Sequence, residues 1–293
     1  MTAPASIRLP APAKINLFLH VLGRRADGYH RLQTLFQFLD HGDRLRLRRT
    51  TGDIRRLGTL PGVSPEADLC LRAARALRAA TGTRAGVEIQ LDKRLPMGAG
   101  LGGGSSDAAS VLLGLNQLWS LGLSREDLAR IGLGLGADVP VFVHGRAAWA
   151  EGVGERLTPV EPEEPWYLVL IPPVTVSTAE IFSAPELTRD TPPITISDFS
   201  RAGGRNDCEA VVRARYPEVG AALDWLETFA PARMTGTGGA VFAAFADAAG
   251  ARAVQARVPA PWQAFVARGR NRSPAWRVLA AWAGARDRRD IGA

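Results

Sequence analysis

Residues 95–109 read LPMGAGLGGGSSDAA, a glycine-rich loop that leads into a helical pattern of apolar residues continuing to Trp119. Five glycines stand directly ahead of two serines and an aspartate. Because glycine has no Cβ and tolerates positive φ, such a loop lets backbone N–H groups turn toward a ligand. Ser105 or Ser106 would cap the helix, whose free N–H groups and positive dipole end favour an anion. The stretch therefore predicts a phosphate site.

Two better-known glycine motifs do not fit this loop. Gly98, Gly100 and Gly103 match the spacing of a dinucleotide-binding turn, but that fold needs an acidic residue about 20 positions later. Residues 119–122 (WSLG) stand there instead. The Walker loop needs a lysine where this chain has Gly104. A flexible surface loop is the remaining alternative, and a direct run into a capped apolar helix argues against it.

The composition indicates a globular protein. The chain has 293 residues, enough for one large or two ordinary domains, and 46% of them are hydrophobic and 22% charged. No apolar run approaches the roughly 18 residues of a membrane helix, and no signal-peptide pattern is evident, so we expect no membrane partner. Cys70 and Cys208 show no metal-ligand spacing, which predicts free thiols in a reducing cytoplasm.

The chain is strongly basic, with a formal net charge of +7 and a pI of about 10.3. This charge raises a nucleic-acid partner as a hypothesis. The arginines are spread along the chain, however, and no RNP, zinc-finger or helix-turn-helix pattern accompanies them. A solvated basic surface that suits anionic small substrates explains the charge better, so we expect no nucleic-acid partner.

Only two of the 36 lysines and arginines are lysines, Lys14 and Lys93. Where arginine serves at every other basic position, a lysine can mark a site that needs a compact point charge. Residues 13–22 alternate strictly, which predicts a strand with Lys14 and Asn16 side by side on one face. The open alternative is a half-exposed edge strand with both polar side chains in water.

The remaining chain alternates between strand and helix patterns. A turn at residues 27–28 is followed by an aromatic residue and an imidazole, which can bind a flat ligand or simply pack a loop. Ser124 begins a capping box and Pro-rich residues 159–165 read as a linker. Further strands are expected at 32–40, 44–49, 87–91, 141–143 and 168–171, and helices at 64–81, 206–215 and 217–229.

Three separated stretches, in this order, resemble the motifs of the GHMP kinases, named for galactokinase, homoserine kinase, mevalonate kinase and phosphomevalonate kinase. They are residues 12–17 (PAKINL), 96–109 and 234–243 (MTGTGGAVFA). Residues 27–30 (DGYH) and 136–140 (GADVP) look like the branch of this superfamily that acts on a cytidine-diphosphate sugar alcohol. The resemblance covers nearly the whole chain.

This resemblance implies a two-domain α+β protein of the GHMP kinase fold with the active site between the domains. Residues 1–160 would form the N-terminal ATP-binding domain and residues 161–293 the C-terminal domain. The implied reaction moves the γ-phosphate of ATP to the 2-hydroxyl of a cytidine-diphosphate sugar alcohol, a step of non-mevalonate isoprenoid synthesis. Mg²⁺ would accompany ATP, and no acidic pair in the sequence identifies its ligands.

The resemblance also assigns the catalytic and ATP-binding residues. Asp138 would accept the proton of the hydroxyl and Lys14 would steady the developing charge, as phosphoryl transfer requires. The alternative for Asp138 is a turn carboxylate that hydrogen-bonds the local backbone. ATP binding is assigned to the loop residues Pro96, Met97, Gly98, Ala99, Gly100, Leu101, Gly102, Gly103, Gly104, Ser105 and Ser106.

Five further residues are assigned to the acceptor by the same resemblance. Asn16 would be an acceptor-site amide. Tyr29 and Phe182 would form the two sides of a cytosine stack, and His30 would read the edge of the base. Thr178 would be a further substrate contact, on a shorter motif match. The sequence leaves the oligomeric state undetermined.

Two other functions remain open at this point. The first is another GHMP small-molecule kinase, of the homoserine or mevalonate type, although a small aliphatic alcohol needs no aromatic clamp such as DGYH. The second is a basic, non-enzymatic nucleotide or RNA binder, which would have no use for both Lys14 and Asp138. The alcohol that stimulates release of ADP from ATP separates all three.

Overall fold

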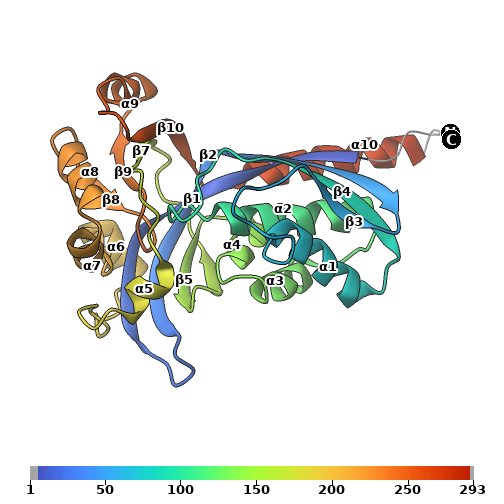
Figure 1. Ribbon diagram of the computed structural model, residues 1–293, viewed down its shortest axis with the longest axis horizontal. Helices are drawn as coiled ribbons and strands as arrows, with labels where there is room; N and C mark the ends of the chain where they lie inside the picture. Colours follow the sequence, from blue (N-terminus) through green and yellow to red (C-terminus); the bar gives the residue numbers. More distant parts are fainter. Residues whose placement is uncertain (1–5, 291–293) are drawn as a thin grey trace.

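The computed structural model describes residues 6–290, in which helices pack against one connected sheet (Figure 1). The ten strands in these residues follow the order β3-β4-β2-β10-β7-β9-β8, with β1 and β5 also paired to β2, and β6 to β5. They are β1 (Ser6–Arg24), β2 (His30–Thr51), β3 (Ile54–Leu57), β4 (Ala85–Asp92), β5 (Ala148–Gly152), β6 (Arg156–Pro159), β7 (Trp166–Ile171), β8 (Ala232–Met234), β9 (Val241–Phe245) and β10 (Gln263–Arg270).

Every strand pair in the described residues is antiparallel except β3 with β4, which confirms the predicted α+β class. The helices lie between these strands in the chain. They are α1 (Leu69–Thr81), α2 (Gly103–Leu118), α3 (Arg125–Leu133), α4 (Val139–His144), α5 (Thr178–Ser183), α6 (Ile196–Ala202), α7 (Glu209–Arg215), α8 (Pro217–Glu227), α9 (Ala248–Gln255) and α10 (Pro274–Asp290). None of the helices within residues 6–290 has the length and apolar character needed to cross a bilayer. Cys70 and Cys208 are free, as predicted, and both are buried.

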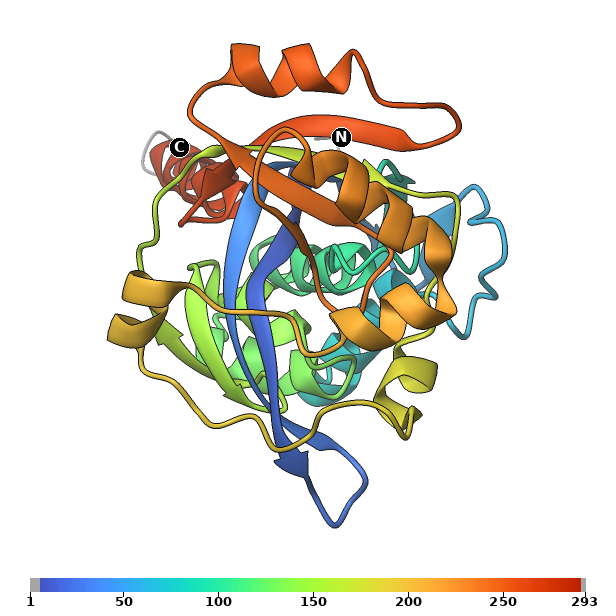
Figure 2. The ribbon, with the colours of Figure 1, turned by 90° about the vertical axis from the view of Figure 1, so that its left-hand side faces the viewer.

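The hairpin of β1 and β2 runs through both halves of the molecule, and its tip at residues 25–29 projects beyond the other elements (Figure 2). The two strands expected at 32–40 and 44–49 are one strand, β2. The sequence misleads here because Gly42 looks like a turn residue. It lies in the strand instead, where a Cβ would meet the carbonyl oxygen of Ala11 at 2.2 Å.

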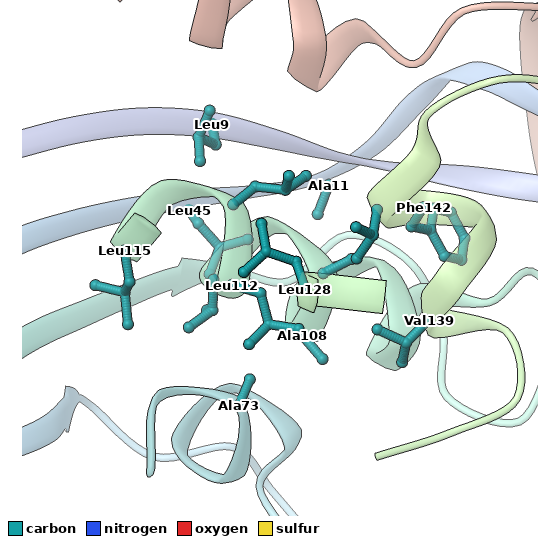
Figure 3. Packing of buried hydrophobic residues seen from close by; sticks show 14 of the residues in the cluster. Leu9, Ala11, Leu45, Ala73, Ala108, Leu112, Leu115, Leu128, Val139 and Phe142 are labelled. Atoms are coloured by element: carbon teal, nitrogen blue, oxygen red, sulfur yellow. The ribbon is translucent and has the colours of Figure 1, made fainter. Parts of the chain in front are cut away.

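The core of the N-terminal half lies between the hairpin and helices α1 to α4. Leu112 and Leu115 of α2 are fully buried and belong to one cluster with Leu9 and Leu45 of the hairpin (Figure 3). Full burial of a leucine side chain contributes about 1.5–3 kcal/mol. This packing therefore fixes the position of α2, and with it the glycine loop at its N-terminus.

The C-terminal half places helices α5 to α9 around β7, β8, β9 and β10, and a second core fills the space between them. Strand β10 pairs with both β7 and β2 and so connects the two halves. Helix α10 then returns to the first half, where Leu279 joins the N-terminal core and Trp276 packs against it. The boundary between domains at residue 160 stays a prediction.

Two local predictions need correction, and a third is confirmed. Residues 141–143 lie in α4 rather than in a strand, because a short, fully buried Val-Phe-Val run has no periodicity that separates the two. Helix α1 begins at Leu69 instead of residue 64, since the Asp68 side chain caps it by accepting from the N–H groups of Cys70 and Leu71. The capping box at Ser124 is present as predicted.

Candidate active site

A cavity of about 780 Å³ opens between the hairpin, the glycine loop, α5 and the start of α4. Its wall includes all the predicted acceptor and catalytic residues: Lys14, Asn16, Tyr29, His30, Asp138, Thr178 and Phe182. Of the predicted ATP-binding residues, Pro96 to Ser105 line it, whereas Ser106 is fully buried behind the wall. The fold thus gathers residues from both halves of the chain around one space.

Helix α2 begins about one turn earlier than it would if Ser105 or Ser106 were its N-cap. Gly102 is the N-cap, with φ of 70°, and neither Ser105 nor Ser106 caps the helix. A Cβ on Gly102 would lie 2.9 Å from Phe142 and 3.0 Å from Lys14, so the backbone approaches both side chains as only glycine can. The first intrahelical bond is Ser106 N–H to Gly102 O, which leaves the N–H groups of residues 103–105 without helical partners. Free N–H groups of this kind are what the predicted anion site requires.

The second glycine stretch, residues 234–239, packs directly against the first. A Cβ on Gly100 would meet the carbonyl oxygens of Thr235 at 2.4 Å and Gly238 at 2.9 Å. The Ala240 N–H donates to Ala99 O at 3.0 Å, which joins the two loops by a backbone bond. The C-terminal half therefore supports the shape of the glycine loop.

Lys14 lies at the centre of this wall and is 3% exposed. Its Nζ donates to Asn16 Oδ1 at 2.6 Å and to Gly100 O at 2.9 Å, and it lies 3.3 Å from Asp138 Oδ2. The alternation of β1 is what brings Lys14 and Asn16 to the same face, as the sequence predicts. The alternative of an exposed edge strand is wrong, because both side chains are buried.

Asp138 precedes α4, and its side chain makes no capping hydrogen bond there. The local turn role weighed from the sequence therefore has no bond to support it. The side chain is 33% exposed and faces the cavity beside Lys14. The carboxylate is thus positioned by the ion pair and open to a ligand.

The far end of the cavity is formed by the hairpin tip and α5. The His30 and Phe182 rings stack with centroids 5.0 Å apart and an interplanar angle of 21°. Tyr29 is 64% exposed and Thr178 Oγ1 lies 2.8 Å from Thr237 Oγ1. Burial lowers the pKa of His30, and the positive charges of Arg189 and Arg24 lower it further. The imidazole is therefore neutral at neutral pH.

Beside the glycine loop the structure adds a charged cluster that the sequence did not predict. Lys93 Nζ lies 2.5 Å from Asp43 Oδ2 and 2.9 Å from Asp107 Oδ2. Asp43 Oδ1 also accepts from the N–H groups of Arg94 and Leu95, so it anchors the segment entering the loop. Burial raises the pKa of Asp107 to about 8, and the nearby Asp43 carboxylate adds to the rise. In the sequence, this cluster is indicated only by the scarcity of lysine, since Lys93 is one of two lysines in the chain.

The described part of the chain does not form a metal site by itself. Within residues 6–290 no three His, Cys, Asp or Glu side chains are grouped closely enough to hold an ion. Asp107 lines the cavity, but its Oδ2 is already bound to Lys93. Mg²⁺ usually keeps several waters and binds substrate phosphates with few protein ligands. The residues present therefore fit only an ion that enters with a phosphate ligand.

Comparison with known proteins agrees with this geometry. The family models of the GHMP kinase N-terminal and C-terminal domains match residues 68–146 and 193–264. A 4-diphosphocytidyl-2-C-methyl-D-erythritol kinase of Halorhodospira halophila is 60% identical over 276 residues, covering 92% of this chain and 96% of the relative. One of Ectopseudomonas mendocina is 59% identical over 96% of this chain and 97% of the relative.

Solved structures give the same result. A crystal structure of 4-(cytidine 5′-diphospho)-2C-methyl-D-erythritol kinase superposes with a TM-score of 0.78 at 34% identity, over 90% of this chain and 99% of that one. A mevalonate kinase, at 15% identity and a TM-score of 0.67, shares the fold alone. The fold and the glycine-loop site are those of a GHMP kinase, and this chain belongs to that superfamily. Within it, the chain belongs to the family of 4-diphosphocytidyl-2-C-methyl-D-erythritol kinases.

Proposed function

We propose that this enzyme transfers the γ-phosphoryl group of ATP to the 2-hydroxyl of 4-diphosphocytidyl-2-C-methyl-D-erythritol, a step in non-mevalonate isoprenoid precursor synthesis. The observation that carries the proposal is the Lys14–Asp138 pair, which lines one cavity together with the glycine loop and the aromatic side chains of Tyr29 and Phe182. Family membership supports the same assignment. Its partners are small molecules, and it works in the cytoplasm without nucleic acid or a membrane.

ATP binds with its phosphates against the glycine loop and the N-terminus of α2. The unpaired N–H groups of residues 103–105 and the helix dipole stabilise the negative charge there. Mg²⁺, when bound with the phosphates, supplies charge neutralisation at the transferring group. Ser106 contributes through its position in the first turn, because its side chain does not reach the cavity wall.

The chemistry follows from the pair of side chains beside the loop. Asp138 accepts the proton of the 2-hydroxyl while the hydroxyl oxygen bonds to the γ-phosphorus and the bond to ADP breaks. The Lys14 ammonium attracts the hydroxyl oxygen and the charge that develops on the phosphoryl group. Asn16, bonded to Lys14 through Oδ1 and to Thr34 through Nδ2, keeps the ammonium in place and faces the acceptor.

The cytidine base of the acceptor occupies the far end of the cavity. Tyr29 and Phe182 stack on the two faces of the base, and His30 hydrogen-bonds its edge. Thr178 contacts the acceptor from the N-terminus of α5. This arrangement holds the alcohol by a part of the molecule remote from the reacting hydroxyl, so that binding energy at the base is used for orientation.

The position of the new phosphate tests the proposal. C2 of the acceptor carries a methyl group and no hydrogen, so a phosphate on the 2-hydroxyl has no proton three bonds away from phosphorus. The new ³¹P resonance of the product should therefore show no proton splitting. A split resonance would place the phosphate on a primary or secondary hydroxyl and would contradict the assigned reaction.

A further inference from the structure

Arg189 connects the two sides of the far end of the cavity, where Tyr29 and His30 lie on one side and Phe182 on the other; this end is called the base pocket below. Its Nε donates to His30 Nε2 at 3.1 Å, on the strand that follows the hairpin tip. Its Nη2 donates to the carbonyl oxygens of Phe182 at 3.0 Å and Ala184 at 2.6 Å, and its Nη1 donates to Leu187 O at 3.0 Å. The guanidinium thus satisfies carbonyl groups at the C-terminal end of α5 and, at the same time, contacts the imidazole.

This contact determines which nitrogen of His30 carries the proton. A guanidinium has only donors, so Nε2 must accept and the neutral ring must be protonated on Nδ1. The ionised groups that face His30 are Arg189 and Arg24, and both are positive. His30 is 7% exposed, and together burial and these charges lower its pKa, so the ring stays neutral. Nδ1–H is then the ring donor available to a ligand in the cavity.

The chemistry of pyrimidine bases makes this tautomer selective. Cytosine presents two neighbouring acceptors, O2 and N3, whereas N3 of uracil carries a proton. A fixed Nδ1–H donor can bond to N3 of cytosine and meets a second donor at N3 of uracil. Sites built around a hydrogen bond reject the analogue that leaves a buried polar group unpaired.

We propose that Arg189 is the positioning residue of the base pocket. It holds His30 as the Nδ1–H tautomer and ties it to Phe182, so that the pocket selects cytosine over uracil. The inference rests on the proposed function for the identity of the acceptor, but not for the preference between the two bases. Arg189 acts through His30 and is not placed against the reacting atoms.

Binding of cytidine and uridine monophosphate, with ADP saturating the ATP site, tests the proposal without turnover. Arg189→Met should weaken cytidine monophosphate binding about tenfold and bring the affinities for the two nucleotides within about twofold of each other. Arg189→Lys, which keeps the charge but loses the fork of donors, should fall between Met and the unchanged enzyme. Arg215→Met is the matched control, because Arg215 contacts α5 through Glu180, and also Glu186, but not His30.

A pH profile separates positioning from a merely structural role. With Arg189 replaced by Met, the pKa of His30 should rise toward its ordinary value of about 6.5, since one of the two positive charges is gone. Affinity for cytidine, which carries no phosphate that titrates in this range, should then change between pH 8 and 6 in the variant and stay flat in the unchanged enzyme. In turnover, the KM for the acceptor should rise while kcat and the KM for ATP stay within about twofold.

A double-mutant cycle of Arg189 and His30 tests whether Arg189 acts on base binding through the imidazole. Arg189→Met should add little to the loss caused by His30→Ala. Unchanged nucleotide preference in both Arg189 variants, or losses that add in full, would overturn the proposal. Failure of the proposed function has a different signature, namely no phosphorylation of the acceptor by the unchanged enzyme even though cytidine monophosphate binds more tightly than uridine monophosphate.

Discussion

Lys14 Nζ and Asp138 Oδ2 lie 3.3 Å apart, although one residue belongs to the first strand and the other directly precedes α4. The lysine ammonium donates to Asn16 and to the carbonyl of Gly100, and these two hydrogen bonds hold it in one position. The aspartate side chain pairs with the lysine, makes no capping hydrogen bond to α4 and is open to the cavity. This difference suits a stationary charge beside a group that must exchange a proton.

Replacement of Asp138 by Asn tests the proton acceptor. Asn keeps the shape and removes the basicity, and a positioned general base contributes about 10²–10⁴ in rate. We expect kcat to fall by that range while the KM values for ATP and acceptor stay within about threefold. Thermal unfolding should be close to that of the unchanged enzyme, because Asp138 makes no capping bond.

Asp224→Asn is the control for this substitution, since Asp224 is exposed on α8 and remote from the cavity wall. It should leave kcat unchanged. A near-normal kcat in the Asp138 variant would remove Asp138 from the mechanism. A loss of activity explained by unfolding would return it to a role in the local turn.

The contact between the two glycine loops predicts a second result. In Gly100→Ala the new Cβ would meet backbone oxygen atoms of the other loop, and Gly100 O would shift away from Lys14. Misplacement of this kind costs about 10²-fold in rate, so kcat/KM for ATP should fall by about that factor. Steady-state kinetics with ATP as the varied substrate measures it.

Gly122→Ala separates the clash from backbone strain. Gly122 also has positive φ, 66°, but nothing lies within 4 Å of its added Cβ. It should lose about 1–2 kcal/mol of unfolding free energy and keep normal kinetics. Equal activity of the two alanine variants would show that the packing of the loops against each other is unimportant for catalysis.

The two aromatic residues at the base pocket should act on the acceptor alone. Stacking of a base on an aromatic side chain is worth about 1–3 kcal/mol, so Tyr29→Ala and Phe182→Ala should each raise the acceptor KM about tenfold or more. The KM for ATP should not move. Tyr29 is largely exposed, so its loss should not lower the melting temperature; normal acceptor affinity in both variants would make them packing residues.

Asp107 predicts how stability depends on pH. The pKa of its carboxyl group is about 8 in the folded protein and about 3.8 when unperturbed. Between pH 3.8 and 8 the folded protein therefore keeps a proton on Asp107 that the unfolded chain has lost. The free energy of unfolding should therefore decrease as pH rises from 4 to 8. Asp107→Asn removes this loss.

Urea unfolding at pH 6 and pH 9 measures the effect. From pH 6 to 9 the unchanged enzyme should lose about 1–3 kcal/mol more than the Asn variant. Asp92→Asn, at an exposed aspartate near the same segment, is the control and should keep the slope of the unchanged enzyme. Parallel pH curves for the Asp107 variant and the unchanged enzyme would contradict the raised pKa.

Residues that lie close together along the chain were predicted well. The alternation of β1 was enough to pair Lys14 with Asn16, and the glycine run was enough to place a glycine loop before a helix. The resemblance supplied Asp138 and Phe182, which no local pattern could bring together with Lys14. Their positions in one cavity depend on packing between distant elements.

Long-range contacts explain what the sequence did not reveal. Gly102 replaces the serines as N-cap because Phe142 and Lys14 approach its backbone, and Phe142 is distant in the chain. The partners of Lys93 come from β2 and α2, and Arg189 donates to His30, which is 159 residues away in the chain. None of these pairings leaves a spacing that a single sequence can show.

A coupled assay of ADP release across a panel of acceptors tests the central claim most directly. With Mg·ATP, 4-diphosphocytidyl-2-C-methyl-D-erythritol should stimulate ADP release strongly, while homoserine and mevalonate should leave it at the level without acceptor. Turnover of either small alcohol at an equal or higher kcat/KM would contradict the assignment of this site to a cytidine-diphosphate sugar alcohol.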